Sequence, residues 1–472
     1  MKKFLSVEDC DALTLEEIKD LYRRHVSPSL AEILDSFSFA DELIVSAEGV
    51  WMTTKSGKRI LDVTGGAGVL NLGHNPESIL RARIRFQQEK RSEVHKSFFS
   101  PYLAALAHNL SCLTPGDLNY SYFCNSGAEA VEGAVKLAYK YHQGKRDLIL
   151  HSDIAYHGKL LASGNLTAKS PREFRFQSVL KHDTFRYDDL ESLREKIRQH
   201  GESIYAIIIE PYSATHLRGL APEFLKELRR TCDERGIVLI FDEIYTGWFK
   251  TGPLFSFMHT DVVPDVLTVS KTLGGGKATI SAYVSRDKIM KSAYGKVKEA
   301  LLHSTTYNGY AEECITAIES LNLLQRPEIA SRPAEIEKKF RQRVEKLSAK
   351  FPGVIEKSNG RGALHGLTFR GDRSLMERAL RLLPTDFFMG DYFVEKLMIA
   401  GVIDRLFTKH QIHCLFMVAG APSLLFAPSL VIRDEEIDRF FDALEDVLSE
   451  GTWPLVSDFI KKKLVKKFTG AK

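Results

Sequence analysis

Two short apolar runs that end abruptly in polar residues constrain the fold of this chain more than any other feature. The first, residues 238–241, ends at Asp242, and the second, residues 266–269, is followed by Ser270 and Lys271. Continuous apolar runs of this length, rich in Val and Ile, are typical of strands buried on both faces of a parallel sheet. Open α/β sheets bind ligands where such strands end. We therefore predict an α/β fold in which Asp242 and Lys271 face one crevice.

An acid and a lysine at one sheet edge suit a particular cofactor, pyridoxal 5'-phosphate (PLP). PLP needs a lysine that loses its proton to form a Schiff base with the aldehyde. It also needs an acid that keeps its charge beside the pyridinium nitrogen. Taken alone, the two residues also allow a simpler interpretation, in which Asp242 caps a strand and Lys271 lies on the surface. The other motifs of the chain decide between these interpretations.

A further motif, residues 122–142, has the pattern of an anion site. It reads YFCNSGAEAVEGAVKLAYKYH: a strand end, a tight turn over residues 125–127, and apolar residues at helical spacing from Ala130 onward. A turn of small residues into a helix N-terminus presents free N–H groups and the positive end of the helix dipole to a phosphate. Glu129 in the first turn equally suits an ordinary capped helix, so the motif alone leaves both interpretations open.

Composition narrows the class of protein. The chain has 472 residues, of which 44% are hydrophobic and 27% charged, so a large globular core is expected and disorder is not. The net charge of +4 gives no reason to expect a nucleic-acid partner. Six cysteines are scattered without a CxxC pair, which favours free thiols in a reducing compartment and predicts no metal site. The chain has no apolar run of about 20 residues and no signal-peptide pattern, so we expect a cytoplasmic protein without a transmembrane segment.

The stretch DEIYTGWFKTG, followed by SKTLGGG, resembles the motifs of class III PLP-dependent aminotransferases of fold type I. That family usually reads D-E-V/I-Q-T-G-F/M-G-R-T-G and then S/A-K-x-L-x-G-G. The resemblance extends over residues 45–450, and the stretch HSTTYNGY is most similar to putrescine-type amine aminotransferases. It implies a large domain with a mostly parallel sheet and a small α+β domain formed by both chain ends. We expect an N-terminal segment at 1–84, the large PLP-binding domain at 85–325 and the C-terminal small domain at 326–472, with the stretch GRGALHGLTF as its first strand.

The resemblance also implies roles for individual residues. Lys271 is expected to form the Schiff base and to move the substrate proton, while Asp242 holds the pyridine nitrogen. The remaining cofactor-binding residues are Ser126, Gly127 and Ala128 in the phosphate turn, Tyr156 and Ile244 on the two faces of the ring, His157, Glu210, Tyr245, and Thr306, which reaches the phosphate of the other subunit in a homodimer.

Three positions depart from the family pattern. Leu425 stands where many members that use 2-oxoglutarate have an arginine, and Thr215 stands where they have the glutamate that holds this arginine. An apolar side chain cannot make the bidentate carboxylate clamp of an arginine. Tyr245 replaces the glutamine that contacts the phenolic oxygen of the cofactor. Another arginine, such as Arg405, remains an alternative source of the clamp.

We therefore expect a homodimeric aminotransferase that acts on small amines and carbonyl compounds with an apolar portion, in secondary metabolism. Two alternatives stay open at the level of sequence. The first is another PLP reaction on the same fold, namely decarboxylation, racemisation or amino-group migration, which uses the same cofactor residues. The second is a scaffold protein that has lost catalysis. The altered substrate clamp favours a scaffold, whereas the intact Lys271 and Asp242 speak against it.

Overall fold

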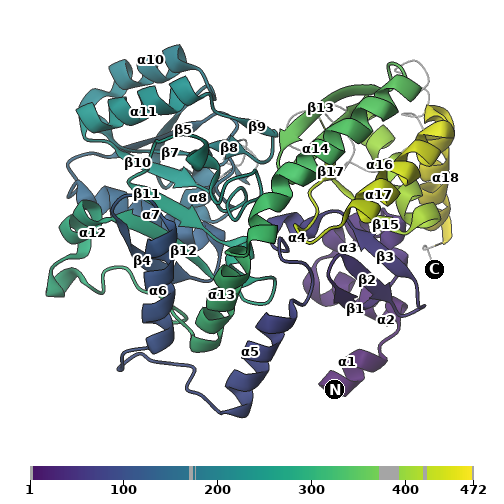
Figure 1. Cartoon of the computed structure of the whole chain (residues 1–472), viewed down its shortest axis with the longest axis horizontal. Helices are drawn as coiled ribbons and strands as arrows, with labels where there is room; N and C mark the ends of the chain where they lie inside the picture. The colour runs from purple at the N-terminus through teal and green to yellow at the C-terminus, as the bar shows by residue number, and fades with distance from the viewer. Residues whose placement is uncertain (1–3, 169–173, 176, 371–392, 418–421, 470–472) are drawn as a thin grey trace.

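The computed structural model describes residues 4–168, 174, 175, 177–370, 393–417 and 422–469. Figure 1 shows a large body built on one twisted sheet and, beside it, a second region in which the N-terminal strands and the C-terminal helices lie together. None of the helices in these ranges is long and apolar enough to cross a membrane.

The large body contains a seven-stranded sheet in the order β4-β12-β11-β10-β7-β5-β6. Its parallel pairs are β11 with β10, β10 with β7, β7 with β5, and β5 with β6, whereas β12 runs antiparallel to both of its neighbours. The prediction of a mostly parallel sheet is therefore confirmed. The strands are β4 (Leu118–Cys124), β5 (Leu148–Ser152), β6 (Lys181–Phe185), β7 (Ile204–Ile209), β10 (Val238–Asp242), β11 (Val266–Val269) and β12 (Ser281–Arg286).

Helices cover both faces of this sheet, because its central strands are apolar on both sides. Ile208 and Ile240 pack against α7 (Gly127–Tyr141) on one face, and Ile207, Leu239 and the buried side chains of α11 (Pro222–Arg235) belong to the core on the other face. The other helices of this body are α5 (Glu77–Gln88), α6 (Pro101–Leu113), α8 (Leu161–Asn165), α10 (Leu190–His200), α12 (Asp287–Tyr294) and α13 (Ala311–Leu324). A small hairpin, β8 (Tyr212–Ser213) and β9 (Arg218–Gly219), follows β7.

The second region joins the two ends of the chain. Its first sheet has the order β1-β2-β3-β15, with β1 (Ile44–Glu48), β2 (Trp51–Thr54), β3 (Arg59–Asp62) and β15 (Ile412–His413). Because β15 pairs with β3, the N- and C-terminal segments build this region jointly, as predicted. Its second sheet has the order β13-β14-β17-β16, with β13 (Ile355–Arg361), β14 (Leu364–Phe369), β16 (Leu415–Met417) and β17 (Ser423–Phe426). The domain boundaries at residues 84 and 325 stay predictions.

The expectation that residues 360–369 form one opening strand was wrong. These residues span the end of β13, a tight turn and β14. Gly362 makes this turn with a φ of +62°, and a Cβ there would lie 2.7 Å from the backbone of Thr251. A glycine is therefore required both for the left-handed backbone and for the close contact with the large body.

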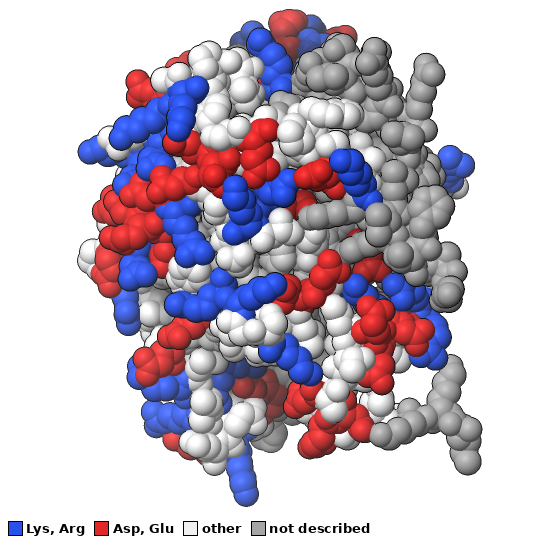
Figure 2. Space-filling view, turned by 90° about the vertical axis from the view of Figure 1, so that its right-hand side faces the viewer, with Lys and Arg blue, Asp and Glu red and all other residues white. Residues whose placement is uncertain are grey.

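Helices cover the outside of the second region. They are α1 (Val7–Ala12), α2 (Leu15–Leu21) and α3 (Pro28–Leu34) from the N-terminal segment, and α14 (Pro327–Lys350), α16 (Phe393–His410), α17 (Asp434–Ser449) and α18 (Thr452–Thr469) from the C-terminal segment. Basic side chains of α14 pair with acids of α17, including Lys339 with Asp438 at 2.7 Å. Figure 2 shows that acidic and basic side chains are interspersed on the face of the molecule drawn there.

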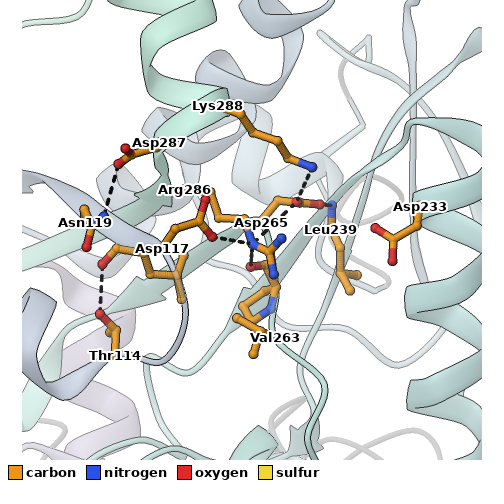
Figure 3. Close-up of polar contacts among 12 residues, drawn as sticks. Thr114, Asp117, Asn119, Asp233, Leu239, Val263, Asp265, Arg286, Asp287 and Lys288 are labelled. Carbon is orange, nitrogen blue, oxygen red and sulfur yellow. Dashed lines mark hydrogen bonds and ion pairs between the residues drawn. The ribbon is translucent and has the colours of Figure 1, made fainter.

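A buried acid fixes the edge of the large sheet opposite to Lys271. Asp265, which directly precedes β11, is only 2% exposed and lies within ion-pair distance of Arg229 (3.0 Å), Lys288 (3.5 Å) and Arg286 (3.9 Å). It also accepts a hydrogen bond of 2.9 Å from the backbone of Leu239 (Figure 3). The carboxylate thus ties α11, β10 and β12 to the start of β11.

We expect Asp265→Ala to lower the free energy of unfolding by about 3–5 kcal/mol, because Arg229 then keeps a largely buried charge without its inner partner. Asp233→Ala is a matched control, since Asp233 pairs with the same arginine at 2.8 Å but its side chain is 55% exposed. We expect this control to lower the free energy of unfolding by less than about 1 kcal/mol. Urea unfolding measures both values, and equal losses for the two variants would contradict the account.

Candidate active site

The carboxyl edge of the large sheet brings together residues that are far apart in the sequence. Ile240 pairs with Val266 and Phe241 pairs with Ile209, so β7, β10 and β11 end side by side. Glu210 directly follows β7, Asp242 is the last residue of β10, and Lys271 follows β11 after one serine. The sheet register thus places these three side chains at one edge.

Asp242 is held from two sides. Its Oδ2 lies 2.7 Å from Nδ1 of His157, and its Oδ1 accepts a 3.0 Å hydrogen bond from the backbone of Ile244. Because a carboxylate only accepts hydrogen bonds, Nδ1 of His157 carries the proton. The other ring nitrogen, Nε2, is buried and has no hydrogen-bond partner among the described residues. Asp242 and His157 are both buried, so the pair forms a rigid acid group at the edge of the sheet.

Glu210 forms a second acid at this edge. It is buried, and its Oε2 accepts a 3.1 Å hydrogen bond from the backbone of Tyr156. Burial raises the pKa of Glu210 to about 7, helped by the negative charge of Asp242 and opposed by His157. Glu210 therefore positions the loop that carries Tyr156, whose own side chain is 45% exposed.

Lys271 has a strained backbone and an unusual neighbour. Its φ is +52°, a left-handed conformation that a side chain other than glycine adopts only where the surrounding structure imposes it. Burial lowers the pKa of Lys271 to about 7, although Asp242 and Glu210 favour the charged form. Its Nζ lies 3.6 Å from the centre of the Tyr245 ring. The lysine is thus prepared to be an uncharged nucleophile near neutral pH.

The turn before α7 lies next to these residues. Ser126 caps the helix by accepting a hydrogen bond from the backbone of Glu129, and Gly127 and Ala128 lie in the first turn, where backbone N–H groups lack helical partners. A Cβ on Gly127 would lie 3.0 Å from Ile244, and one on Gly158, which follows His157, would lie 2.8 Å from Ala128. The turn, Ile244 and the loop over residues 156–158 therefore border one space.

The clamp position is filled by an apolar cluster. Leu425 is buried together with Tyr212, Ala214, Leu217, Leu364 and Ala427, and Tyr245 and Met417 pack against this cluster. Arg405, the alternative clamp, lies on α16 and pairs with Glu450 at 3.0 Å and Asp458 at 2.7 Å. Arg405 therefore already forms ion pairs with two acids of the C-terminal segment.

Sequence reasoning missed Lys250. This lysine is completely buried, and its Nζ donates hydrogen bonds to the carbonyls of Ala427 (2.9 Å) and Pro428 (2.8 Å), directly after β17. Burial lowers the pKa of Lys250 to about 7. It connects the motif that begins at Asp242 to the strand that carries Leu425. Its position in that motif, where the family pattern has an arginine, was the signal that could have identified it.

Thr306 stands apart from the other predicted residues. It lies on the exposed loop that precedes α13, and the neighbouring Thr305 accepts a 3.1 Å hydrogen bond from Lys96 through its backbone carbonyl. The remaining predicted site residues lie at the sheet edge or in the turn and loops that border it.

Comparison with known proteins agrees with this architecture. The family model "Aminotransferase class-III" matches residues 39–448. Among solved structures, the chain is similar to the ornithine aminotransferase of Toxoplasma gondii ME49 (TM-score 0.78, 22% identity, 95% of this chain and 99% of that chain covered). It is also similar to a transaminase from the marine bacterium Virgibacillus (TM-score 0.75, 19% identity, 98% and 97% covered). A third similar structure is an (S)-enantioselective omega-transaminase from Thermomicrobium roseum (TM-score 0.73, 24% identity, 87% and 92% covered).

The chain belongs to the class III aminotransferase family, with the PLP fold type I. It is a PLP-dependent aminotransferase, and the residues at the sheet edge fit this cofactor. The first turn of α7 offers free amides to a phosphate, Asp242 offers a buried acid, and Lys271 offers an amine with a lowered pKa. Two buried polar atoms, Nε2 of His157 and the hydroxyl of Tyr245, have no hydrogen-bond partner among the described residues.

Proposed function

We propose that this enzyme transfers an amino group from a small amine to an aldehyde or ketone and does not use the arginine clamp of 2-oxoglutarate enzymes. The observation that carries this proposal is the burial of Leu425 in an apolar cluster that reaches Tyr245, the neighbour of Lys271. At the position of the family's arginine, a substrate beside this cluster meets the hydrocarbon side chain of Leu425. Terminal amines and apolar carbonyl compounds suit such a surface, because they bring no carboxylate that needs a partner.

Lys271 is the catalytic residue in this proposal. Its amine would hold the cofactor and, once the amino donor has released it, would take up the proton of the substrate carbon and give it back as the amino group is transferred. The lowered pKa of Lys271, about 7, supports this role because a base works best near the working pH. Bound PLP supplies the electron sink that makes this proton acidic.

The other predicted residues hold the cofactor in place. Asp242, oriented by His157, keeps the pyridine nitrogen protonated, and Glu210 fixes the backbone of Tyr156. Tyr156 and Ile244 would contact the cofactor ring from opposite sides, and stacking of the Tyr156 ring would contribute about 0.5–1.5 kcal/mol beyond the buried area. The amides of Gly127 and Ala128, with Ser126, bind the phosphate at the positive end of α7.

We also propose a homodimer in which Thr306 reaches the phosphate of the other subunit. Two surface segments, residues 93–99 and residues 297–311, support this assembly. They lie next to each other, because the backbone N–H of Ala311 donates a hydrogen bond to the carbonyl of Glu93 and Lys96 donates one to the carbonyl of Thr305. These segments expose large apolar side chains: Phe98 (77%), Phe99 (104%), Val297 (95%), Leu301 (81%) and Tyr307 (57%). Apolar surface of this kind marks an interaction site.

Leu301→Asp is therefore expected to convert the dimer into a monomer that lacks transaminase activity, because the charge enters the apolar contact and each site loses the partner's threonine. Analytical ultracentrifugation measures the assembly. Val45→Asp, at an apolar residue of the edge strand β1 that is 58% exposed, is the control and is expected to remain dimeric and active. A wild-type protein that is monomeric and fully active at nanomolar concentration would contradict the proposal.

A half-reaction screen tests the proposed substrate class. The PLP-loaded enzyme is mixed with single amines, and the loss of the visible absorbance of the bound cofactor reports transfer of the amino group. We expect terminal amines with an apolar chain to bleach the band, and carbonyl acceptors to restore it. Release of carbon dioxide from an amino acid, or racemisation without bleaching, would show that a different PLP reaction takes place.

A further inference from the structure

The neighbour of Lys271 that is particular to this chain is the aromatic ring of Tyr245. The amine lies 3.6 Å from the ring centre, which is the geometry of a cation–π contact. The family pattern has glutamine at this position, and glutamine has no aromatic face. The contact therefore distinguishes this chain from the pattern it otherwise follows.

The ring is held in place by packing and not by a hydrogen bond. Tyr245 packs against the apolar cluster around Leu425, and its buried hydroxyl has no hydrogen-bond partner among the described residues. Gly68, with a φ of +89°, lies against both members of the pair. A Cβ at this position would lie 3.3 Å from Cε1 of Tyr245 and 3.4 Å from Cδ of Lys271. The glycine leaves the space that the stacked lysine and tyrosine occupy.

The charges around Lys271 do not by themselves determine whether its amine is protonated. Asp242 at the end of β10 and Glu210 after β7 favour the ammonium form, and burial opposes it. Lys250 is the nearby cation, and it repels Lys271. Removing a lysine from water costs several kcal/mol unless a partner compensates, and the electron-rich face of an aromatic ring is such a partner.

We propose that Tyr245 is a positioning residue for Lys271: when the lysine carries no cofactor, the ring face of Tyr245 holds its protonated amine over the sheet edge. This inference rests on the proposed role of Lys271 as the residue that carries the cofactor. The family's glutamine makes a polar contact with the cofactor. The ring of Tyr245, in contrast, contacts the amine of Lys271. It therefore sets how readily the amine of Lys271 becomes a nucleophile at neutral pH.

The pH dependence of Lys271 acetylation tests this inference in the full-length chain without cofactor. Acetic anhydride reacts only with the uncharged amine, so the rate of modification at each pH, read by mass spectrometry of the Lys271 peptide, gives the midpoint of its titration. The exposed Lys277 serves as an internal reference whose midpoint stays the same in every variant. The variants are Tyr245→Phe, which keeps the ring, and Tyr245→Leu and Tyr245→Gln, which remove it.

We expect Tyr245→Phe to keep the wild-type midpoint and both ringless variants to lower it by about 0.4 to 1.5 pH units, the range that one cation–π contact supplies. Equal midpoints in the wild type and in a folded ringless variant would overturn the inference. So would a Tyr245→Phe midpoint as low as that of Tyr245→Leu, because the hydroxyl and not the ring would then hold the amine. Circular dichroism selects the folded variants, and the glutamine variant carries the residue typical of the family.

A separate readout distinguishes this inference from the proposed function. Borohydride reduction of the PLP-loaded wild type, followed by peptide mapping, reports whether the cofactor is attached to Lys271. A cofactor on another lysine removes the proposed role of Lys271, whatever the acetylation midpoints are. A cofactor on Lys271 together with unchanged midpoints overturns only the role of Tyr245. In the loaded enzyme, we expect the pH midpoint of the cofactor's visible absorbance to follow the same order of variants.

Discussion

Lys271→Ala is expected to lower the turnover number for transamination by at least about 10²–10⁴-fold, the contribution of a positioned acid–base group. The loss of covalent attachment adds to this effect. The variant still has the amides of α7 and the acid Asp242, so we expect it to bind PLP without a covalent bond. Its visible absorbance should be that of the free aldehyde, and mixing with an amine donor should produce turnover only at this reduced rate.

Lys277→Ala is the matched control for this prediction. Lys277 lies in the same loop, is exposed and donates a hydrogen bond of 2.5 Å to Asn75. Because this lysine does not touch the sheet edge, we expect its removal to leave the turnover number within about twofold of the wild type. Substantial activity in Lys271→Ala, measured under the same conditions, would show that another group moves the proton.

The second large effect concerns the acceptor. We expect kcat/KM for 2-oxoglutarate to be at least about 100-fold below that for a long-chain aldehyde, with pyruvate in between. A carboxylate that enters beside Leu425 loses its hydration and gains no partner, which costs several kcal/mol, and each 1.4 kcal/mol corresponds to about tenfold. 2-Oxoglutarate carries two carboxylates, pyruvate one and the aldehyde none. Stopped-flow reaction of the aminated enzyme with each acceptor measures this order.

Restoring the arginine clamp should improve 2-oxoglutarate as an acceptor. In the double variant Leu425→Arg with Thr215→Glu, the guanidinium has an acid partner when no substrate is bound, and we expect 2-oxoglutarate to improve relative to the aldehyde. Leu425→Met conserves the volume and apolar character of the cluster and is expected to keep the wild-type preference. Saturable use of 2-oxoglutarate by the wild type at micromolar concentration would show that a different residue supplies the clamp.

The sequence predicts those parts of the fold that local patterns control. The apolar runs at residues 238–241 and 266–269 are strands β10 and β11, and the helical pattern from Ala130 onward belongs to α7. The motif residues at strand ends meet at one edge because the central strands are parallel. This alignment follows from the hydrophobic pattern, since strands buried on both faces are characteristic of parallel sheets.

Other features depend on contacts between distant segments, which a local pattern does not contain. The antiparallel direction of β12 is set by its pairing with β4 and β11, and the turn at Gly362 is set by its contact with Thr251. The hydrogen bonds of Lys250 to the residues after β17 join positions that are more than 170 residues apart. The presence of a lysine in a motif does not indicate which distant residues it contacts.

The site likewise combines features that local sequence patterns predict with features that depend on distant contacts. The chemistry of Lys271 and Asp242 can be predicted from their motifs, whereas the orientation of Asp242 by His157 depends on a 2.7 Å contact between the end of β10 and a distant loop. The position of the Lys271 amine over the Tyr245 ring also depends on the space left by Gly68, a residue of the N-terminal segment. These arrangements follow from tertiary packing and not from the residues next to them in the sequence.

Borohydride reduction of the PLP-loaded wild-type enzyme, followed by peptide mapping, tests the central claim most directly. Among the described residues, both Lys271 and Lys250 are suitable in principle, because burial lowers the pKa of each to about 7. Lys250 already donates to two carbonyls after β17, whereas Lys271 lies beside Asp242 and Tyr245 at the sheet edge. We predict one cofactor per chain, attached to the peptide that contains Lys271. A cofactor on the Lys250 peptide, or no attached cofactor, would contradict the account.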